Sequence, residues 1–457
     1  MVDKNLTLID VWEGLHGVLV AADGPGDASF SRAIIDSREA APGDLFFALH
    51  GERADAHDFV PAAFRAGAAG AVVARPVDAP EGASVFHVSD PLVGLQRLAS
   101  SWRARHKARV IAVTGSVGKT TAKEVIASVL SRRYNTLKTE ANLNTEIGVP
   151  LSLLKLTAAH DRAVLELGMY LPGDIALLAR IAQPEVGVVT NVEPVHLERA
   201  GSISRITSGK AELVEALPPH GLAVLNGDDP RVAAMSRRTR ARSVLFGLSE
   251  QCDIRATEIE SRGLAGLSFV IHAGGQSVRV ACRLAGRHHV YAALAAASVA
   301  MNDGMSLAEV ADALGGVRLE LRLTVRPGPN GSTLIDDSYN ASPASMLAAL
   351  DLLSECSGRR VAVLGHMREL GSAESEGHRR VGSYASRRCE LLIVVGEDAR
   401  TLADAALEAG HADVRVVATP KEATAILQRE LSAGDHCLIK ASRAVGLESV
   451  VEAVVVR

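Results

Sequence analysis

Aromatic residues make up only 3% of the 457 residues, so aliphatic side chains must fill the hydrophobic cores. No stretch approaches the roughly 18 uninterrupted apolar residues of a membrane-spanning helix, and the N-terminal residues lack a signal-peptide pattern. The net charge is −4 and no block of Lys or Arg occurs. Because binding to a phosphate backbone needs clustered cations, nucleic acid is not expected as a partner.

Cysteines are few and scattered. The chain has five of them, an odd number, with no C-x-x-C pair and no metal-ligand spacing. They are Cys252, Cys282, Cys356, Cys389 and Cys437. We therefore expect a protein of the reducing cytoplasm.

The chain length suggests about three domains. A first section with short strands and few helices is expected over residues 1–108. Alternating strands and helices over 109–317 and again over 318–457 predict two α/β units with parallel sheets, the second one Rossmann-like. The strands of these two units are expected at Val110–Val113, Arg162–Leu167, Val186–Thr190, Ala223–Leu225, Ser243–Phe246, Ser332–Ile335, Arg360–Leu364, Leu391–Val395 and His436–Ile439. The Gly-rich segment 263–275 predicts a short stretch of antiparallel strands within the otherwise parallel unit.

The strand Val110–Val113 is followed by Thr-Gly-Ser-Val-Gly-Lys-Thr-Thr and then by a helix, expected over Lys123–Leu130. Glycines let backbone N–H groups converge on phosphate oxygens, and a helix N-terminus adds a favourable dipole. Lys119 would neutralise the β- and γ-phosphates, and the Thr120 hydroxyl would bind Mg²⁺. The general P-loop pattern is not met, since Val113 stands where its first glycine would be. An ATP-dependent enzyme is nevertheless expected.

An acidic residue, Glu166, ends the apolar run Ala163–Leu165. Ligands bind at the carboxyl edge of open α/β sheets, so this side chain would emerge beside the phosphate loop. From the residues alone, a metal ligand and a solvated carboxylate at a strand end are equally good interpretations.

The short loop Thr-Gly-x-x-Gly-Lys-Thr-Thr resembles that of the Mur ligases, the ATP-driven amide ligases that build the peptidoglycan stem peptide. The order and spacing of further segments strengthen the resemblance along the whole chain. These segments are Asp36–Arg38, Gly43–Leu49, Gly51–Arg53, His57–Phe59, Ala141–Pro150, Glu166–Met169, Val195–Glu198, Asp336–Ala341 and Lys440–Arg443. They are most similar to the branch of the family that joins D-Ala-D-Ala to UDP-MurNAc-tripeptide.

The resemblance implies three domains that bind the UDP-sugar, ATP and the incoming amine in turn. It implies that ATP converts a peptide carboxylate into an acyl phosphate, which the amine then attacks. The enzyme is expected to act as a monomer in the cytoplasm, with ATP and two Mg²⁺ ions.

Site residues follow from the same resemblance. For catalysis it implies Lys119, Lys210, His196 and Asn144. For ATP it implies Thr114, Gly115, Ser116, Val117, Gly118, Lys119, Thr120, Thr121, His289, Arg322 and Asp337. For the substrates it implies Ser37, Arg38, Asn142, Asn340, Lys440, Ser442 and Arg443. For the metal it implies Thr120, Glu166, His196 and Lys210, and Lys210 matches the lysine that is carbamylated in the family. On the bare sequence, a lysine on a helix surface is the better interpretation of Lys210.

The chain departs from the family pattern at several positions. His289 and Ala292 stand where the adenine-contacting stretch usually has asparagines, His366 replaces an aspartate and Ser342 replaces an asparagine. A Mur-type ligase for another amine or carboxylate is therefore an alternative. A nucleotide-binding regulatory protein without ligase activity is a further one, although Lys119, Glu166 and His196 are all present.

Overall fold

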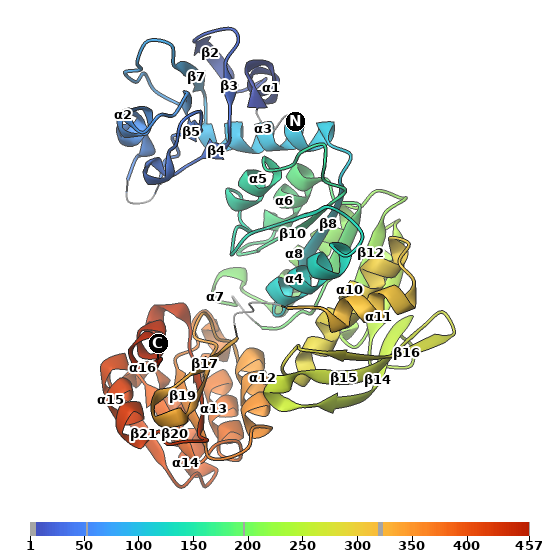
Figure 1. Cartoon of the computed structure of the whole chain (residues 1–457), viewed down its shortest axis with the longest axis vertical. Coiled ribbons are helices and arrows are strands. Elements are labelled where there is room, and N and C mark those ends of the chain that lie inside the picture. The colour runs from blue at the N-terminus through green and yellow to red at the C-terminus, as the bar shows by residue number, and fades with distance from the viewer. Residues whose placement is uncertain (1–5, 52–53, 195–196, 319–322, 457) are drawn as a thin grey trace.

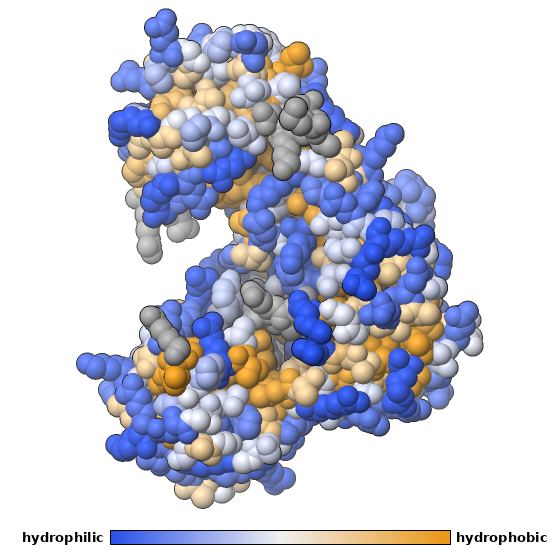
Figure 2. Space-filling model, in the orientation of Figure 1, coloured by the Kyte–Doolittle hydropathy of each residue, from blue (hydrophilic) through white to orange (hydrophobic). Residues whose placement is uncertain are grey.

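The structure is a computed structural model that describes residues 6–51, 54–194, 197–318 and 323–456. It consists of three α/β units in chain order, with the middle unit joining the other two (Figure 1). In the space-filling view the molecule is deeply hollowed between the N-terminal and C-terminal units (Figure 2). Among the described residues, no helix combines the length and apolarity needed to cross a membrane.

The N-terminal unit is a five-stranded sheet whose order is β2-β7-β6-β5-β4. Its strands are β2 (Leu19–Asp23), β4 (Ala33–Ile34), β5 (Leu45–Phe47), β6 (Gly70–Val73) and β7 (Ser84–Val88). A two-stranded sheet of β1 (Leu6–Thr7) and β3 (Ser29–Phe30) lies beside it. Its helices are α1 (Leu8–Gly14), α2 (Val60–Arg65) and α3 (Pro91–Arg105).

Helix α3 fastens this unit to the next one. It starts where the Asp90 side chain accepts hydrogen bonds from the first-turn amides, with Pro91 at the position that proline favours. Trp102 Nε1 donates to Leu156 O at 3.0 Å, and Arg103 Nε donates to Ala182 O at 3.1 Å. One hydrophobic core therefore runs without interruption from the N-terminal sheet through α3 into the middle unit.

The middle unit is a nine-stranded sheet whose order is β16-β15-β14-β13-β12-β11-β8-β10-β9. Its parallel strands are β8 (Arg109–Thr114), β9 (Thr136–Lys138), β10 (Arg162–Glu166), β11 (Val186–Val189), β12 (Leu222–Asn226), β13 (Arg242–Gly247) and β14 (Ile254–Ser261). Strands β15 (Leu267–Ala273) and β16 (Gln276–Cys282) continue the sheet in antiparallel fashion, as the Gly-rich segment predicts. Its helices are α4 (Lys119–Leu130), α5 (Gly148–Leu153), α6 (Asp174–Ala182), α7 (Leu197–Ala200), α8 (Ile203–Glu215), α9 (Pro230–Ala233), α10 (Val290–Asn302) and α11 (Leu307–Gly315).

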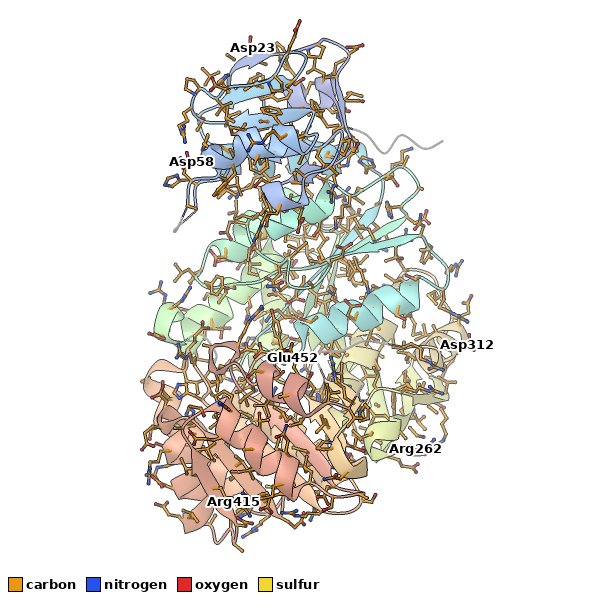
Figure 3. All side chains as sticks on the ribbon, turned by 60° about the vertical axis from the view of Figure 1, so that its left-hand side comes forward. Asp23, Asp58, Arg262, Asp312, Arg415 and Glu452 are labelled. Carbon is orange, nitrogen blue, oxygen red and sulfur yellow. The ribbon has the colours of Figure 1, made fainter. Side chains whose placement is uncertain are left out.

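The C-terminal unit is a six-stranded sheet whose order is β17-β18-β22-β19-β20-β21, with only β17 antiparallel. Its strands are β17 (Thr324–Pro327), β18 (Thr333–Asp336), β19 (Arg360–Gly365), β20 (Leu391–Val395), β21 (Val414–Val417) and β22 (His436–Lys440). Its helices are α12 (Pro343–Ser354), α13 (Glu374–Ala385), α14 (Arg400–Glu408), α15 (Pro420–Glu430) and α16 (Glu448–Val454). The turn at Arg262, marked in Figure 3, lies against this unit, because Leu264 packs on its core.

The α/β fold class predicted from the sequence is confirmed. Helix α4 begins at Lys119, four residues before the expected start at Lys123, because Gly118 adopts the left-handed conformation (φ +81°) and serves as the N-cap. Strands β9, β14 and β21 and the bounds of helix α8 were not predicted, and α8 carries Lys210 of the site described below.

We expect Gly382→Ala to destabilise the C-terminal unit by about 1–3 kcal/mol, the usual cost of overpacking a core. A Cβ atom on Gly382 in α13 would lie 2.0 Å from the carbonyl oxygen of Leu402 in α14, so the two helices would have to separate. Thermal unfolding followed by circular dichroism measures the effect. Gly26→Ala is the control, since no atom lies within 4 Å of a Cβ there. An unchanged transition in Gly382→Ala would show that the helices do not pack this closely.

Candidate active site

Strand β8 lies between β10 and β11, so the strand order of the middle sheet reverses at its carboxyl end. Ligands of doubly wound sheets bind at such a switch point. Three loops meet there, and they follow β8, β10 and β11. They carry the phosphate-loop residues 115–118, the strand end at Glu166, and the segment 190–194.

The phosphate loop depends on two glycines. Gly115 has φ +148°, and a Cβ atom there would lie 1.9 Å from Thr190 Oγ1. Gly118 turns the chain into α4 in the left-handed conformation. The first-turn amides of a helix point out of its end without intrahelical acceptors, so those of α4 face the switch point.

The segment after β11 braces the loop from behind. Asn191 accepts a hydrogen bond from Val117 N through Oδ1 at 2.8 Å and donates through Nδ2 to Val117 O at 3.0 Å. Its carbonyl accepts from Ser116 N at 2.9 Å. The amides of Ser116 and Val117 therefore hold the loop itself, and the amides at the start of α4 are the ones directed toward a phosphate. Sequence reasoning missed Asn191, although a polar residue directly after a buried strand is a signal for this sheet edge.

Two hydroxyl groups and an amine follow the loop. Lys119 Nζ donates to the carbonyls of Gly115 at 2.9 Å and Ser116 at 3.1 Å, so its ammonium lies over the loop. Thr120 and Thr121 are half-buried in the first turn of α4, and Thr114 is buried at the end of β8 with its hydroxyl bonded to Leu167 O. Thr114 thus ties the loop to the segment that follows Glu166.

Glu166 is buried, with only 1% of its surface exposed. Asn144 Nδ2 donates to Glu166 Oε1 at 2.8 Å, whereas Oε2 is buried and finds no hydrogen-bond donor among the described residues. The solvated-carboxylate interpretation is therefore wrong. A buried carboxylate oxygen without a donor is costly unless a cation neutralises it.

This donor chemistry fits Mg²⁺, which prefers carboxylate and hydroxyl oxygens and keeps several waters. Glu166 Oε2 is the unsatisfied oxygen, and Thr120 is in the first turn of the phosphate-loop helix. Among the described residues, no cluster of three or more His, Cys, Asp and Glu could hold a metal by itself.

Lys210 lies on α8 and is buried, with 3% of its surface exposed, so the prediction of a helix-surface lysine is wrong. Desolvation by burial, together with the positive charge of Lys119, lowers the pKa of Lys210 well below its ordinary value. The sequence held a signal for this burial. Lys210 stands four residues after Ile206 and four before Val214, on the apolar stripe of the helix.

His289 is buried at the start of α10, and its Nδ1 donates to Ala285 O at 2.6 Å. Burial lowers the pKa of His289 to about 4, so the ring is neutral at pH 7 and its Nε2 is an acceptor. Ala292 is buried one turn further on. His196 and Arg322 lie outside the described residues, so their predicted roles stay predictions.

In the C-terminal unit, five predicted residues lie at or just beyond the carboxyl ends of β18 and β22: Asp337, Asn340, Lys440, Ser442 and Arg443. Lys440 is buried, and its Nζ donates to Asp337 Oδ2 at 2.6 Å and to Asn340 O at 2.8 Å. The guanidinium of Arg443 lies 5.2 Å from the ring centroid of Tyr339. Ser442 Oγ accepts from Arg368 N at 2.9 Å. The bonds of Lys440 join the carboxyl ends of β18 and β22, and the Ser442 bond joins the segment after β22 to the segment after β19.

The remaining predicted substrate residues are more exposed. Asp36 accepts from the backbone N–H and the guanidinium of Arg38, which lowers the pKa of Asp36 to about 2. Ser37 and Arg38 form a short 3-10 turn after it, with 88% of the Arg38 side chain exposed. Asn142 is exposed in the loop before α5. The structure thus places these residues at the surface of the N-terminal and middle units.

At two positions where the sequence differs from the family pattern, Ser342 and His366, the structure shows what the side chain contacts. Ser342 caps α12 by accepting from Ser345 N, a role that serine and asparagine fill equally well. His366 Nδ1 donates to Asp398 O at 3.0 Å, and its Nε2 lies 3.8 Å from Glu374 Oε1. The first substitution therefore keeps the local structure, and the second places an imidazole beside a carboxylate.

The fold and the loop define a nucleotide-binding enzyme of the doubly wound α/β class. Residues 113–300 match the Mur ligase middle domain, and residues 321–443 match the Mur ligase, glutamate ligase domain. The chain belongs to the Mur ligase family, because it also aligns with curated relatives over nearly its full length.

One such relative is the UDP-N-acetylmuramoyl-tripeptide–D-alanyl-D-alanine ligase of Synechocystis, which is 38% identical over 98% of this chain and 97% of its own. The crystal structure of MurF from Acinetobacter baumannii superposes with a TM-score of 0.88 at 33% identity, covering 98% of both chains. MurF of Thermotoga maritima, solved with ADP, has a TM-score of 0.81 at 29% identity, over 92% of this chain and 96% of that one. The resemblance inferred from the sequence is confirmed.

We expect Gly115→Ala to abolish nucleotide binding while leaving the fold intact. The added Cβ would collide with Thr190 Oγ1, and the loop would have to leave the position in which Asn191 holds it. Calorimetric titration with ADP and Mg²⁺ measures binding, and circular dichroism checks the fold. Gly274→Ala is the control, because it shares a positive φ but has no neighbour within 4 Å. Equal ADP affinity in the two variants would contradict this account of the loop.

Proposed function

We propose that this protein joins D-Ala-D-Ala to UDP-MurNAc-tripeptide and cleaves ATP to ADP and phosphate as it does so. The observation that carries the proposal is the convergence at one sheet edge of the phosphate loop, the unsatisfied Glu166 oxygen and the buried Lys210. Relatives that match nearly the whole chain carry the name UDP-N-acetylmuramoyl-tripeptide–D-alanyl-D-alanine ligase, which supports the choice of substrates.

The reaction brings anions together, so the site must supply positive charge. The tripeptide carboxylate attacks the γ-phosphorus, the bond to the β–γ bridging oxygen breaks, and ADP leaves. The amine of D-Ala-D-Ala then attacks the acyl phosphate, loses a proton, and inorganic phosphate departs as the amide forms. In our proposal Lys119 leaves the loop carbonyls to neutralise the phosphates, and the first-turn amides of α4 hold their oxygens.

Mg²⁺ would be held by Glu166 and Thr120, with Lys210 and His196 at a second ion. Bound there, the ion would neutralise phosphate charge during transfer. Asn144 would keep Glu166 turned so that Oε2 faces the ion, since Oε1 is already bonded to its amide. The roles of His289 and Asp337 at the nucleotide, and of Asn142, Asn340 and Lys440 at the substrates, are part of the same proposal.

Carbamylation of Lys210 is chemically favoured by its burial. A neutral amine attacks CO₂, forms an N–C bond and releases a proton, whereas an ammonium cannot react. Because burial lowers the pKa of Lys210, much more of the amine is neutral at pH 7 than in an exposed lysine. The carbamate would replace the buried amine with a metal-binding carboxylate-like group.

We also propose the division into a UDP-sugar unit (1–108), an ATP unit (109–317) and an amine-substrate unit (318–457), acting as a monomer in the cytoplasm. The three large sheets fall within these ranges, which supports the division. All five cysteines are free, as expected in a reducing compartment.

The function is tested by phosphate release with ATP, UDP-MurNAc-tripeptide and D-Ala-D-Ala. We expect release only when both substrates are present, and we expect Lys119→Ala to lower kcat by about 100- to 1,000-fold because it removes charge stabilisation of the transferred phosphate. Lys107→Ala, at an exposed lysine, is the control. If the two substrates do not stimulate phosphate release, the proposal is wrong. A panel of other amines would then reveal a different acceptor.

Replacing Lys210 with methionine should separate stability from activity. Below the ordinary lysine pKa of about 10.4, the Lys210 amine is protonated in the unfolded chain. Burial disfavours this protonation in the folded protein, so Lys210 lowers the free energy of unfolding below that pH. In CO₂-free buffer at pH 7, Lys210→Met should unfold at a higher urea concentration than the parent and lack ligase activity. The stability difference should shrink as the pH rises toward about 10.4. Equal stability at every pH would contradict the burial of a lysine that resists protonation.

A further inference from the structure

A second lysine of the phosphate-loop helix is buried, and the reaction outlined above does not use it. Lys123 lies one turn after Lys119 on α4, with 0% of its surface exposed. Its Nζ donates to Thr139 O at 2.7 Å and forms an ion pair with Glu124 Oε1 at 2.8 Å. Lysine is almost never fully buried unless it is paired, so such a side chain needs a reason.

The carbonyl that Lys123 takes belongs to the end of strand β9. Strands β9 and β10 pair in parallel up to Lys138 and Val164, and Thr139 N still donates to Val164 O at 3.0 Å. In a regular parallel ladder, the next bond would run from Glu166 N to Thr139 O. Here Glu166 N donates instead to the hydroxyl Oγ1 of Thr139 at 3.1 Å. The Thr139 carbonyl accepts from Lys123 Nζ, and the threonine hydroxyl takes the place of that carbonyl in the ladder.

Strand β9 ends where this exchange occurs, and the chain leaves the ladder. After Thr139 the backbone enters the loop 140–147, in which Ala141 has φ +45°. The loop brings Asn144 onto β10, where its amide holds Glu166 Oε1 and its carbonyl accepts from Gly168 N at 2.8 Å. The Glu166 backbone is therefore held by Thr139, and its carboxylate by Asn144, from the same redirected segment.

The ion pair with Glu124 does not by itself explain the buried lysine. Glu124 also pairs with Lys138, a half-exposed lysine on the neighbouring strand. A methionine at position 123 would leave that pair intact and avoid the cost of burying an ammonium. What Lys138 does not supply is the bond to Thr139 O.

We propose that Lys123 is a positioning residue for the metal site: by capturing the Thr139 carbonyl, it sets the Thr139 and Asn144 contacts that hold Glu166 with Oε2 free for Mg²⁺. This inference rests on the proposed function, because it takes Glu166 as the metal ligand. Lys123 itself touches neither the ion nor a substrate.

The test is the affinity of the full chain for ADP, measured by calorimetry over a series of free Mg²⁺ concentrations. Mg²⁺ should tighten ADP binding, and the quantity compared is the Mg²⁺ concentration that gives half of this gain in affinity. We expect Lys123→Met to raise that concentration by about 10- to 100-fold, the usual effect of losing an outer-shell partner. ADP affinity without Mg²⁺ should stay unchanged, because the phosphate loop is intact. Lys138→Met is the matched control and should behave like the parent, since it removes only the second partner of Glu124.

A second pair of variants keeps the inference testable if Lys123→Met does not fold. Thr139→Val removes the acceptor for Glu166 N and should raise the half-saturating Mg²⁺ concentration, whereas Thr139→Ser keeps the hydroxyl and should restore it. A folded Lys123→Met with the parent's Mg²⁺ dependence, or equal behaviour of the two Thr139 variants, would overturn the inference. If the parent itself shows no Mg²⁺-dependent gain, or Glu166→Gln retains it, the metal site of the proposed function fails instead.

Discussion

One buried carboxylate constrains the rest of this site. Glu166 lies at the end of a central strand with almost no solvent contact, and only one of its oxygens has a donor among the described residues. An ionised group in that position is tolerated only if a cation balances it. Lys119 Nζ donates to two carbonyls of the phosphate loop, and burial together with the charge of Lys119 lowers the pKa of Lys210. In the proposed function, a metal ion bound with the nucleotide balances this charge, so the rest of the site is arranged around Glu166.

Much of this arrangement could be predicted from the sequence. Apolar runs located strands β8, β10, β11, β12 and β13 of the middle sheet and β18, β19, β20 and β22 of the C-terminal sheet, and the Gly-Lys-Thr at a strand–helix junction located the phosphate loop. Glu166 was found because an acidic residue at the end of a buried strand emerges at the ligand-binding edge. These features are local, since each depends on a few consecutive residues and on a general rule of sheet topology.

What could not be predicted depends on contacts between distant segments. The burial of Lys210 requires α8 to lie against the sheet, and the bond from Lys123 to Thr139 requires a side chain to break the regular ladder of β9. Asn191 braces the phosphate loop across 74 positions of sequence. The neutral state of His289 also depends on the folded structure, because it follows from burial rather than from residues adjacent in the sequence.

Helix α3 has a consequence for how the molecule moves and folds. Because a single core continues through it from the N-terminal sheet into the middle unit, those two units share one cooperative packing arrangement. The two faces of the C-terminal sheet have cores of their own. We therefore expect the N-terminal sheet and the phosphate loop to move together, and the hollow seen in Figure 2 to change mainly where the C-terminal unit meets the middle unit at contacts such as Leu264.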